Sequence, residues 1–190
     1  MSDTTGSNWN LPNAITIVRI FFAPVFLVLL LIDGGADAAL RWIAAILFIV
    51  GIATDGVDGH IARSRGLVTD LGKLLDPIAD KILTGAALVG LSILAELPWW
   101  VTIIVLIREV GITVHRMIIR HDHVVAAAWM GKLKTVFQSV AISFALVPLW
   151  SFLGDWIFVV NGILMTIAVI LTIASGLDYV WTAMKAKRSR

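Results

Sequence analysis

Residues 54–81 read TDGVDGHIARSRGLVTDLGKLLDPIADK. This stretch joins two of the apolar segments of the chain and places acidic side chains among them. Its fixed positions follow the pattern D-x2-D-G-x2-A-R-x8-G-x3-D-x3-D, formed by Asp55, Asp58, Gly59, Ala62, Arg63, Gly72, Asp76 and Asp80. A charged side chain near the centre of a membrane helix costs about 2.5–3.5 kcal/mol, so four acids cost roughly 10–14 kcal/mol unless a partner neutralises them. Divalent cations are the obvious partner.

The composition of the whole chain is that of a membrane protein. Of its 190 residues, 59% are hydrophobic and 15% are charged, and the mean hydropathy is +0.93. Soluble domains contain about 45–50% apolar residues. The chain has no cysteine, which excludes disulfide bonds and thiolate metal sites. The short polar start, residues 1–12, has no basic residue and does not resemble a signal peptide.

Six apolar segments predict an all-α integral membrane protein that forms one domain over residues 1–190. Each segment is close to the ~20 residues that cross ~30 Å of hydrocarbon as a helix. The predicted transmembrane helices are residues 14–32, 39–62, 74–94, 98–118, 133–152 and 156–182. Asn13 is a candidate N-cap for the first of them.

Basic residues alternate between the two sets of loops, and this alternation predicts the topology. One set, together with the basic tail 185–190, contains Arg63, Arg65, Lys73, Arg116, Arg120, Lys132, Lys134, Lys185, Lys187, Arg188 and Arg190. The opposite set contains only Arg41 as a basic residue. The positive-inside rule therefore places both termini in the cytoplasm.

The spacing of the acids predicts that they meet between two helices. At 100° per residue, Asp55 and Asp58 lie within an arc of ~100° on one helix. Asp76 and Asp80 share one face of the next helix. A cytoplasmic turn lets these helices run antiparallel, so the four carboxylates converge. Hard oxygen ligands of this kind suit Mg2+, Mn2+ or Ca2+, and four acids can hold two cations.

Small residues and an arginine accompany the acids. Gly59, Ala62 and Gly72 leave room for a ligand to approach the backbone. Arg63, at the end of its helix, can pair with a phosphate or a carboxylate. Pro77 removes a backbone donor, so the helix could bend or start there.

The acids also allow a structural interpretation. Either pair alone could form ordinary intramembrane ion pairs with Arg19, Lys81 or Arg108. On a helix Lys81 points ~100° away from its acidic neighbour, which favours a role as a cation at a helix interface. Arg108 and Glu109 could form an internal ion pair or support the metal site, and Arg19 leaves the same choice open.

Taken together, the eight positions resemble the signature of the CDP-alcohol phosphatidyltransferases. The resemblance implies a fold of six transmembrane helices, a homodimer, and displacement of CMP from a CDP-linked lipid by the hydroxyl group of an alcohol. It also implies two divalent cations, Mg2+ or Mn2+, bound by Asp55, Asp58, Asp76 and Asp80. Asp80 would bind the second cation or act as the catalytic base. The implied CDP-binding residues are Asp55, Gly59, Ala62, Arg63 and Gly72.

Further stretches resemble the branch of this family whose acceptor is sn-glycerol 3-phosphate. They are NLPNAITIVR at 10–19, LDPIADK at 75–81, IRE at 107–109 and GKLKTVFQ at 131–138. This resemblance implies transfer of a phosphatidyl group from CDP-diacylglycerol to glycerol 3-phosphate, with release of CMP, at the cytoplasmic face of a bacterial cell membrane.

Other acceptors and one other class of protein stay open. Family members that use phosphatidylglycerol or inositol phosphate share several of these features. An acid-lined cation transporter is a remote alternative, disfavoured because the chain has no repeated halves. Nothing in the sequence indicates a nucleic-acid partner.

An acceptor that carries its own phosphate needs a basic pocket beside the metals. Arg116, Lys132 and Lys134 lie at the cytoplasmic ends of the fourth and fifth predicted helices and are the candidates. Anchoring of the helix ends by the positive-inside effect is the alternative role for each. His115 is more typical of a packed or interfacial residue than of a ligand.

Overall fold

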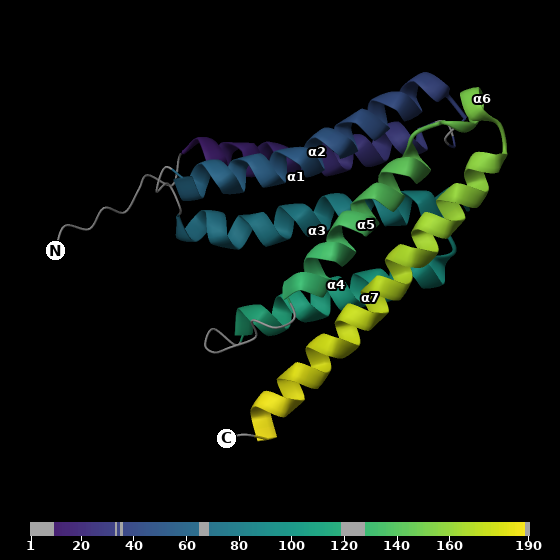
Figure 1. The fold of residues 1–190 in the computed structure, drawn as a ribbon. Helices are drawn as coiled ribbons and strands as arrows, with labels where there is room; N and C mark the ends of the chain where they lie inside the picture. The colour runs from purple at the N-terminus through teal and green to yellow at the C-terminus, as the bar shows by residue number, and fades with distance from the viewer. Residues whose placement is uncertain (1–9, 33, 35, 65–68, 119–127, 189–190) are drawn as a thin grey trace. The chain divides into compact units, whose positions relative to one another are not determined.

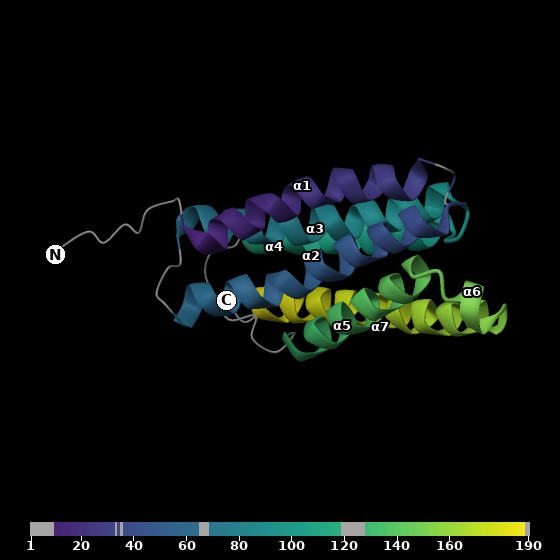
Figure 2. The same cartoon turned by 90° about the horizontal axis from the view of Figure 1, so that it is seen from above.

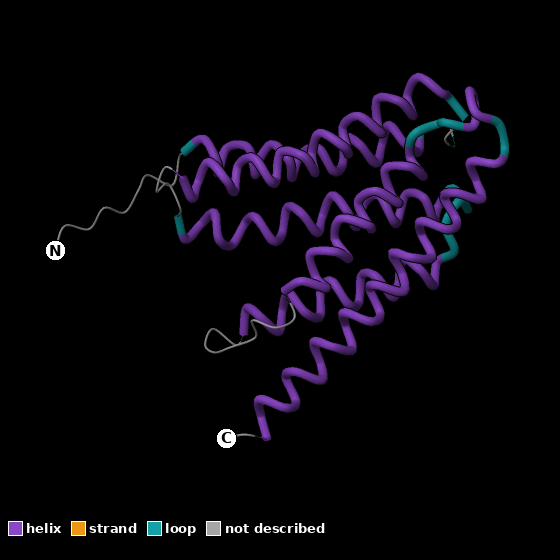
Figure 3. Tube along the Cα trace, in the orientation of Figure 1, coloured by secondary structure: helices purple, strands orange, loops and turns teal. Residues whose placement is uncertain are grey.

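The computed structural model describes residues 10–32, 34, 36–64, 69–118 and 128–188. Within these ranges, the side chains of residues 11, 56–63, 70–71, 73–74, 116–118, 128 and 186–188 lie outside the description. The described chain is helical and contains no strand (Figures 1 and 3). Its helices are α1 (Leu11–Leu31), α2 (Ala38–Ser64), α3 (Asp70–Ile93), α4 (Trp99–Ile118), α5 (Ala128–Leu146), α6 (Trp150–Leu153) and α7 (Trp156–Arg188). The predicted all-α class is confirmed.

The chain divides into two compact units, Met1–Gly90 and Leu91–Arg190. The first unit holds α1, α2 and most of α3, and the second holds α4 to α7. The single domain expected for residues 1–190 stays a prediction.

Helix α1 begins where the sequence supplies a side-chain cap. Asn10 has an extended backbone (φ −127°, ψ 164°), and its side chain accepts the N–H of Asn13 at 3.0 Å. Pro12 follows in the first turn, where a missing N–H leaves no helical bond unmade. The prediction that Asn13 is the N-cap is therefore wrong, because the helix starts a turn earlier than the apolar segment does.

The first unit is built on the packing of α1 along α2 (Figures 1 and 2). The rings of Phe26 and Phe48 join these helices with centroids 5.8 Å apart. Helix α3 approaches α2 closely at Gly51, where an added Cβ would lie 2.5 Å from Cδ2 of Leu83. Helix α3 also runs without a break through Pro77, so the helix does not start at that proline.

In the second unit, α4 and α5 both contact α7. The fifth predicted helix, 133–152, differs from α5 at both ends. Pro148 has no N–H to donate and interrupts the helix, and the single turn of α6 ends at Gly154, whose φ is 79°. The sixth predicted helix, 156–182, continues in the structure to Arg188.

Three described helices contain segments long and apolar enough to cross a membrane. These segments are Pro12–Leu31 of α1, Ala38–Asp55 of α2 and Trp156–Lys185 of α7. Phe21 and Ile170 on two of them are more than half exposed, as side chains in contact with lipid would be. Helices α3 and α4 carry charged groups in their middle turns instead, among them Asp80 and Glu109. The chain is a membrane protein with several candidate spans.

Candidate active site

Asp55 lies on α2, one turn beyond the close contact at Gly51, and is held by an arginine from α1. Arg19 Nη1 donates to Asp55 Oδ1 at 2.5 Å. The side chain of Arg19 is only 1% exposed, whereas that of Asp55 is 43% exposed. A buried guanidinium needs such a partner because an unpaired buried charge is costly. The structure therefore gives Arg19 a partner among the predicted metal ligands and leaves the acid itself accessible.

Asp76 lies on α3 and is contacted by a hydroxyl group from α1. Thr16 Oγ1 donates to Asp76 Oδ1 at 2.9 Å. The Thr16 hydroxyl also lies 3.1 Å from the carbonyl oxygen of Pro12. Thr16 is 1% exposed, while Asp76 is partly exposed. Hydrogen bonds to an ionised acceptor are roughly twice as strong as neutral ones. The carboxylate is therefore the better of the two acceptors for this hydroxyl.

Helix α1 contacts both of these acids through neighbouring side chains. Thr16 and Arg19 are three residues apart, so they lie on the same face of α1. Asp55 from α2 and Asp76 from α3 therefore contact a single turn of a third helix. The expected convergence of the four carboxylates between the two helices stays a prediction.

Asp80 lies one turn after Asp76 on α3 and carries its own lysine. Lys81 Nζ donates to Asp80 Oδ2 at 2.8 Å, and the two side chains are 27% and 28% exposed. The expectation that Lys81 points away from Asp80 is wrong. The long lysine side chain bends back across the helix surface, although the two Cα–Cβ directions diverge.

The start of α3 packs tightly against the start of α1 at Gly72. Thr69 Oγ1 accepts both the Gly72 N–H at 3.0 Å and Nδ2 of Asn13 at 2.8 Å. A Cβ on Gly72 would lie 2.6 Å from Asn13 Oδ1 and 3.3 Å from Thr69 Oγ1. Close helix contact is thus one reason for a glycine here. Its predicted role in CDP binding stays a prediction.

Several predicted site residues fall outside what the structure describes. Asp58, Gly59, Ala62 and Arg63 belong to α2, but their side chains are not described. The side chain of Arg116 on α4 is not described either. The roles expected for these five residues stay predictions.

The candidate acceptor lysines have different surroundings on α5. Lys132 is exposed, whereas Lys134 is 1% exposed and forms an ion pair with Glu109 of α4. Arg108 Nη1 also contacts Glu109 Oε1 at 3.3 Å, and its Nη2 donates to Ser175 Oγ of α7 at 3.0 Å. The internal ion pair of Arg108 with Glu109 that the sequence allowed is therefore present, and Lys134 adds a second pair that the sequence did not predict. Phosphate binding by Lys132 and Lys134 stays a prediction.

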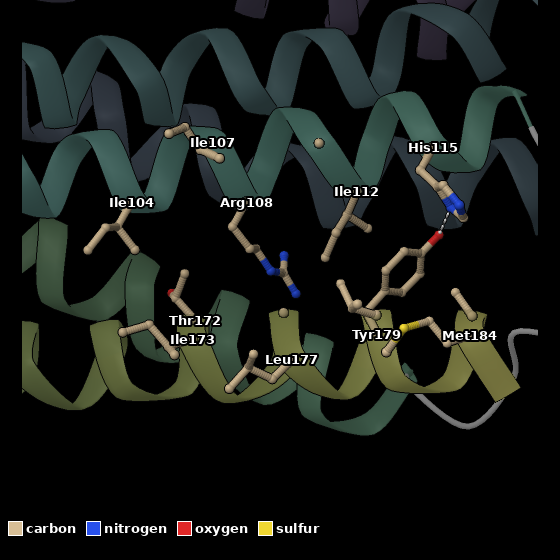
Figure 4. Close-up of a pocket in the computed structure, with 14 residues that line it drawn as sticks. Ile104, Ile107, Arg108, Ile112, His115, Thr172, Ile173, Leu177, Tyr179 and Met184 are labelled. Atoms are coloured by element: carbon tan, nitrogen blue, oxygen red, sulfur yellow. Dashed lines mark hydrogen bonds between the residues drawn. The ribbon is translucent and has the colours of Figure 1, made fainter.

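A cavity of about 680 Å³ lies between α4 and α7 (Figure 4). Its lining is mainly aliphatic, with Arg108 pointing from α4 toward α7 and a polar pair at one end. This pair is His115 and Tyr179, whose Nδ1 and Oη are 2.7 Å apart and whose rings meet edge to face. His115 is thus packed against a tyrosine, in agreement with its expected role. Among the side chains that the structure describes, no predicted site residue lines the cavity.

The described donors fit a hard divalent cation. Asp55, Asp76 and Asp80 are oxygen donors, and each side chain is at least partly accessible. Carboxylates without sulfur ligands suit Mg2+ or Mn2+ rather than softer metals. Among the described residues no group of three acids or histidines is close enough to form a complete metal site. The fourth predicted ligand, Asp58, lies outside the description.

Three contacts to the site were missed by reading the sequence for acids and glycines alone. Asn13, Thr16 and Thr69 are all buried, and each bonds a predicted site residue or its neighbour. The sequence pattern did contain an indication that Asn13 and Thr16 share a helix face with Arg19. With Arg19 they form a row of polar residues at intervals of three in an otherwise apolar segment, which is the spacing of one helix face.

The chain is similar to one family of proteins over most of its length. The family model of the CDP-alcohol phosphatidyltransferases matches residues 9–174. The chain is 44% identical to a probable phosphatidylglycerophosphate synthase of Mycobacterium tuberculosis over 93% of this chain and 82% of that protein. It is 38% identical to a CDP-diacylglycerol–glycerol-3-phosphate 3-phosphatidyltransferase of Bacillus subtilis over 93% and 98% of the two chains. A protein of the same name from Rickettsia typhi is 35% identical over 90% and 94%.

Proposed function

The chain belongs to the CDP-alcohol phosphatidyltransferase family, and we infer from its relatives that it catalyses the phosphatidylglycerophosphate synthase reaction. It is a phosphatidyltransferase of the membrane. Its substrates are CDP-diacylglycerol and sn-glycerol 3-phosphate, and its products are phosphatidylglycerophosphate and CMP. The family model confirms the family predicted from the sequence, and the relatives confirm the predicted acceptor.

The acids on α2 and α3 supply the catalytic centre of this proposal. The observation that carries it is the meeting of Asp55 and Asp76 at one turn of α1, inside a signature that also contains Asp58 and Asp80. When bound to these carboxylates, two divalent cations would neutralise the pyrophosphate and stabilise departing CMP. Gly59, Ala62, Arg63 and Gly72 line the CDP site in this proposal.

Asp80 acts as the base in the proposed reaction. The acceptor oxygen forms a bond to the phosphatidyl phosphorus, the bond from this phosphorus to the CMP oxygen breaks, and the hydroxyl proton passes to Asp80. Lys81 engages Oδ2 of Asp80, and among the described residues Oδ1 has no hydrogen-bond partner. Oδ1 is therefore the oxygen we assign to the proton. Arg116, Lys132 and Lys134 bind the acceptor phosphate in this scheme.

The proposal extends to topology and assembly. Six crossings by α1, α2, α3, α4, α5 and α7 would leave both termini and the acids on the cytoplasmic side of a bacterial cell membrane. The charge alternation of the loops supports this orientation. We also propose that the protein forms the homodimer that the family resemblance implies. Light scattering of the detergent-solubilised protein would measure its molar mass and so test the dimer.

An acceptor panel tests the proposed function. Purified enzyme in detergent, given CDP-diacylglycerol and Mg2+ or Mn2+, should release CMP fastest with glycerol 3-phosphate. Phosphatidylglycerol, inositol phosphate and a sample without acceptor are the comparison arms. Faster release with phosphatidylglycerol or inositol phosphate would reassign the acceptor, and no release with any alcohol would remove the transferase activity.

A further inference from the structure

We propose that Thr16 is a positioning residue that fixes the carboxylate of Asp76 for metal binding. The inference rests on the proposed function, because it assigns Asp76 to a divalent cation. Its basis is a contact between helices that are distant in the sequence: Thr16 Oγ1 on α1 donates to Asp76 Oδ1 on α3 at 2.9 Å. The hydroxyl touches neither lipid nor acceptor in this account and acts only through the acid.

The surroundings of Thr16 make the contact a fixed one. Thr16 is 1% exposed, so water does not compete for its hydroxyl. The turn of α1 that carries it is held at both ends. Asn13 on one side is bonded to Thr69, and Arg19 on the other side is bonded to Asp55. A donor on a rigid, buried helix face restricts the rotation of the carboxylate it holds.

The contact leaves the other oxygen of Asp76 for a cation. Among the described residues, Oδ1 of Asp76 is bonded to Thr16 and Oδ2 has no hydrogen-bond partner. A carboxylate bonded through one oxygen keeps the second in a defined direction. Hydrogen bonds of this kind orient metal ligands, and their loss typically lowers metal affinity or activity about 10–100-fold.

A purely structural role for Thr16 makes a different prediction. Buried threonines in helices commonly donate to the carbonyl four residues earlier, and Pro12 O lies 3.1 Å from the same hydroxyl. A threonine that only ties the helix together would affect stability without affecting a metal bound to Asp76. Metal affinity separates the two roles, because only the positioning role changes it.

The experiment measures Mn2+ binding to the full-length protein in detergent by electron paramagnetic resonance of the free ion. Thr16→Val, which replaces the hydroxyl by a methyl group, should weaken binding about 10–100-fold. Thr16→Ser keeps the donor and should restore wild-type affinity. Thr16→Ala removes the hydroxyl without adding bulk, so it gives a second measurement if the valine variant does not fold.

Thr172→Val is the matched control. Thr172 on α7 is also fully buried and donates to the carbonyl four residues earlier, Ala168 O, at 2.7 Å, and no acid among the described residues is hydrogen-bonded to its hydroxyl. This variant should bind Mn2+ as the wild type does. A double variant tests the route of the effect: once Asp76→Asn has removed the charged ligand, adding Thr16→Val should weaken binding no further.

The outcomes separate this inference from the function beneath it. Unchanged Mn2+ affinity in Thr16→Val and Thr16→Ala, or a serine variant as weak as the valine variant, would overturn the positioning role alone. A wild-type protein that binds no Mn2+ but releases CMP on addition of glycerol 3-phosphate would overturn the metal assignment and this inference together. Binding that falls with the hydroxyl and returns with serine supports it.

Discussion

At the scale of single residues, the site is a set of acids, each with its own partner. Asp55 is paired with an arginine, Asp76 with a hydroxyl group and Asp80 with a lysine. These partners give the three carboxylates different surroundings. Asp80 is partly exposed and has one oxygen engaged by a lysine, and the proposed function assigns it the proton of the incoming alcohol.

Replacement of Asp80 tests its assignment as the base. Asp80→Asn keeps the size of the side chain and removes its basicity, so kcat should fall by about 10²–10⁴-fold while the folded protein is retained. Initial rates of CMP release and a size-exclusion profile are the measurements. Lys81→Met, which removes only the partner, serves as the control for the lost ion pair. A near-normal kcat in Asp80→Asn contradicts the base assignment.

Lys134 poses a second question at this scale, because it is buried against Glu109 and is also a candidate for the acceptor phosphate. Lys134→Met removes one of the two cations that contact the buried carboxylate of Glu109. Arg108 still contacts that carboxylate, so the cost should not exceed the roughly 3–5 kcal/mol of an uncompensated buried charge. We expect a lower midpoint of unfolding in detergent. Combining Lys134→Met with Glu109→Gln removes both charges of this pair. The amide oxygen can still accept from Arg108 Nη1 but no longer neutralises it, so the double variant should recover part of that stability.

The same pair of variants tests phosphate binding by Lys134. If the lysine contacts the acceptor, the KM for glycerol 3-phosphate stays raised in the stable double variant, while the KM for CDP-diacylglycerol changes little. An acceptor KM equal to that of the wild type would leave Lys134 with a structural role only. A single variant as stable as the wild type would contradict the ion-pair argument itself.

At the scale of helices, the site depends on how closely the ends of α1 and α3 approach. This approach occurs at Gly72, where side chains from two segments fill the space that a Cβ would occupy. The contact fixes the start of α3, and the same helix carries Asp76 and Asp80 one and two turns further along. Displacing the start of α3 would therefore move two predicted ligands.

Gly72→Ala tests this close approach. The new methyl carbon would lie 2.6 Å from Asn13 Oδ1, so either the Asn13 side chain leaves its bond to Thr69 or the helices shift. Overpacking of this kind typically costs about 1–3 kcal/mol. We expect a lower unfolding midpoint and reduced CMP release. Gly162→Ala on α7 is the control, because no described atom lies within 4 Å of its added Cβ, and it should be neutral or stabilising. Equal stability of the two variants would contradict the tight contact.

The helices also show how far the sequence determines the site. Apolar length predicted α1, α2, α3 and α4 within a few residues, because a helix must be long enough to cross the bilayer. It misplaced α5, since a proline near an apolar boundary was counted as part of the span. Helical spacing placed Asp76 and Asp80 on one face. It gave no partner for either acid, because a contact such as Thr16 to Asp76 joins positions 60 residues apart.

At the scale of the whole molecule, the proposed orientation in the membrane decides which substrates reach the acids. Glycerol 3-phosphate is a charged molecule that arrives from water, and the predicted acids lie near the loops that carry the basic residues. An acceptor that comes from the cytoplasm reaches these acids only if the basic loops face the cytoplasm. The orientation is therefore part of the mechanism.

The absence of cysteine allows a direct test of this orientation. Single cysteines at Ala36 and Asp155 should react with a membrane-impermeant maleimide in intact cells. Cysteines at Ser2 and Lys185 should react only after lysis, since the positive-inside rule places both ends in the cytoplasm. The unsubstituted chain is the control and should not be labelled. The opposite labelling pattern would contradict the proposed topology.

The central claim is that carboxylates from α2 and α3 hold two divalent cations around the diphosphate of a CDP-linked lipid. The most direct measurement is anomalous X-ray scattering from crystals grown with Mn2+ and CDP-diacylglycerol. We predict two manganese peaks, bound by the carboxylates of Asp55, Asp58, Asp76 and Asp80 and by the lipid diphosphate. Manganese peaks elsewhere, or none beside these four acids while the lipid is bound, would contradict the account.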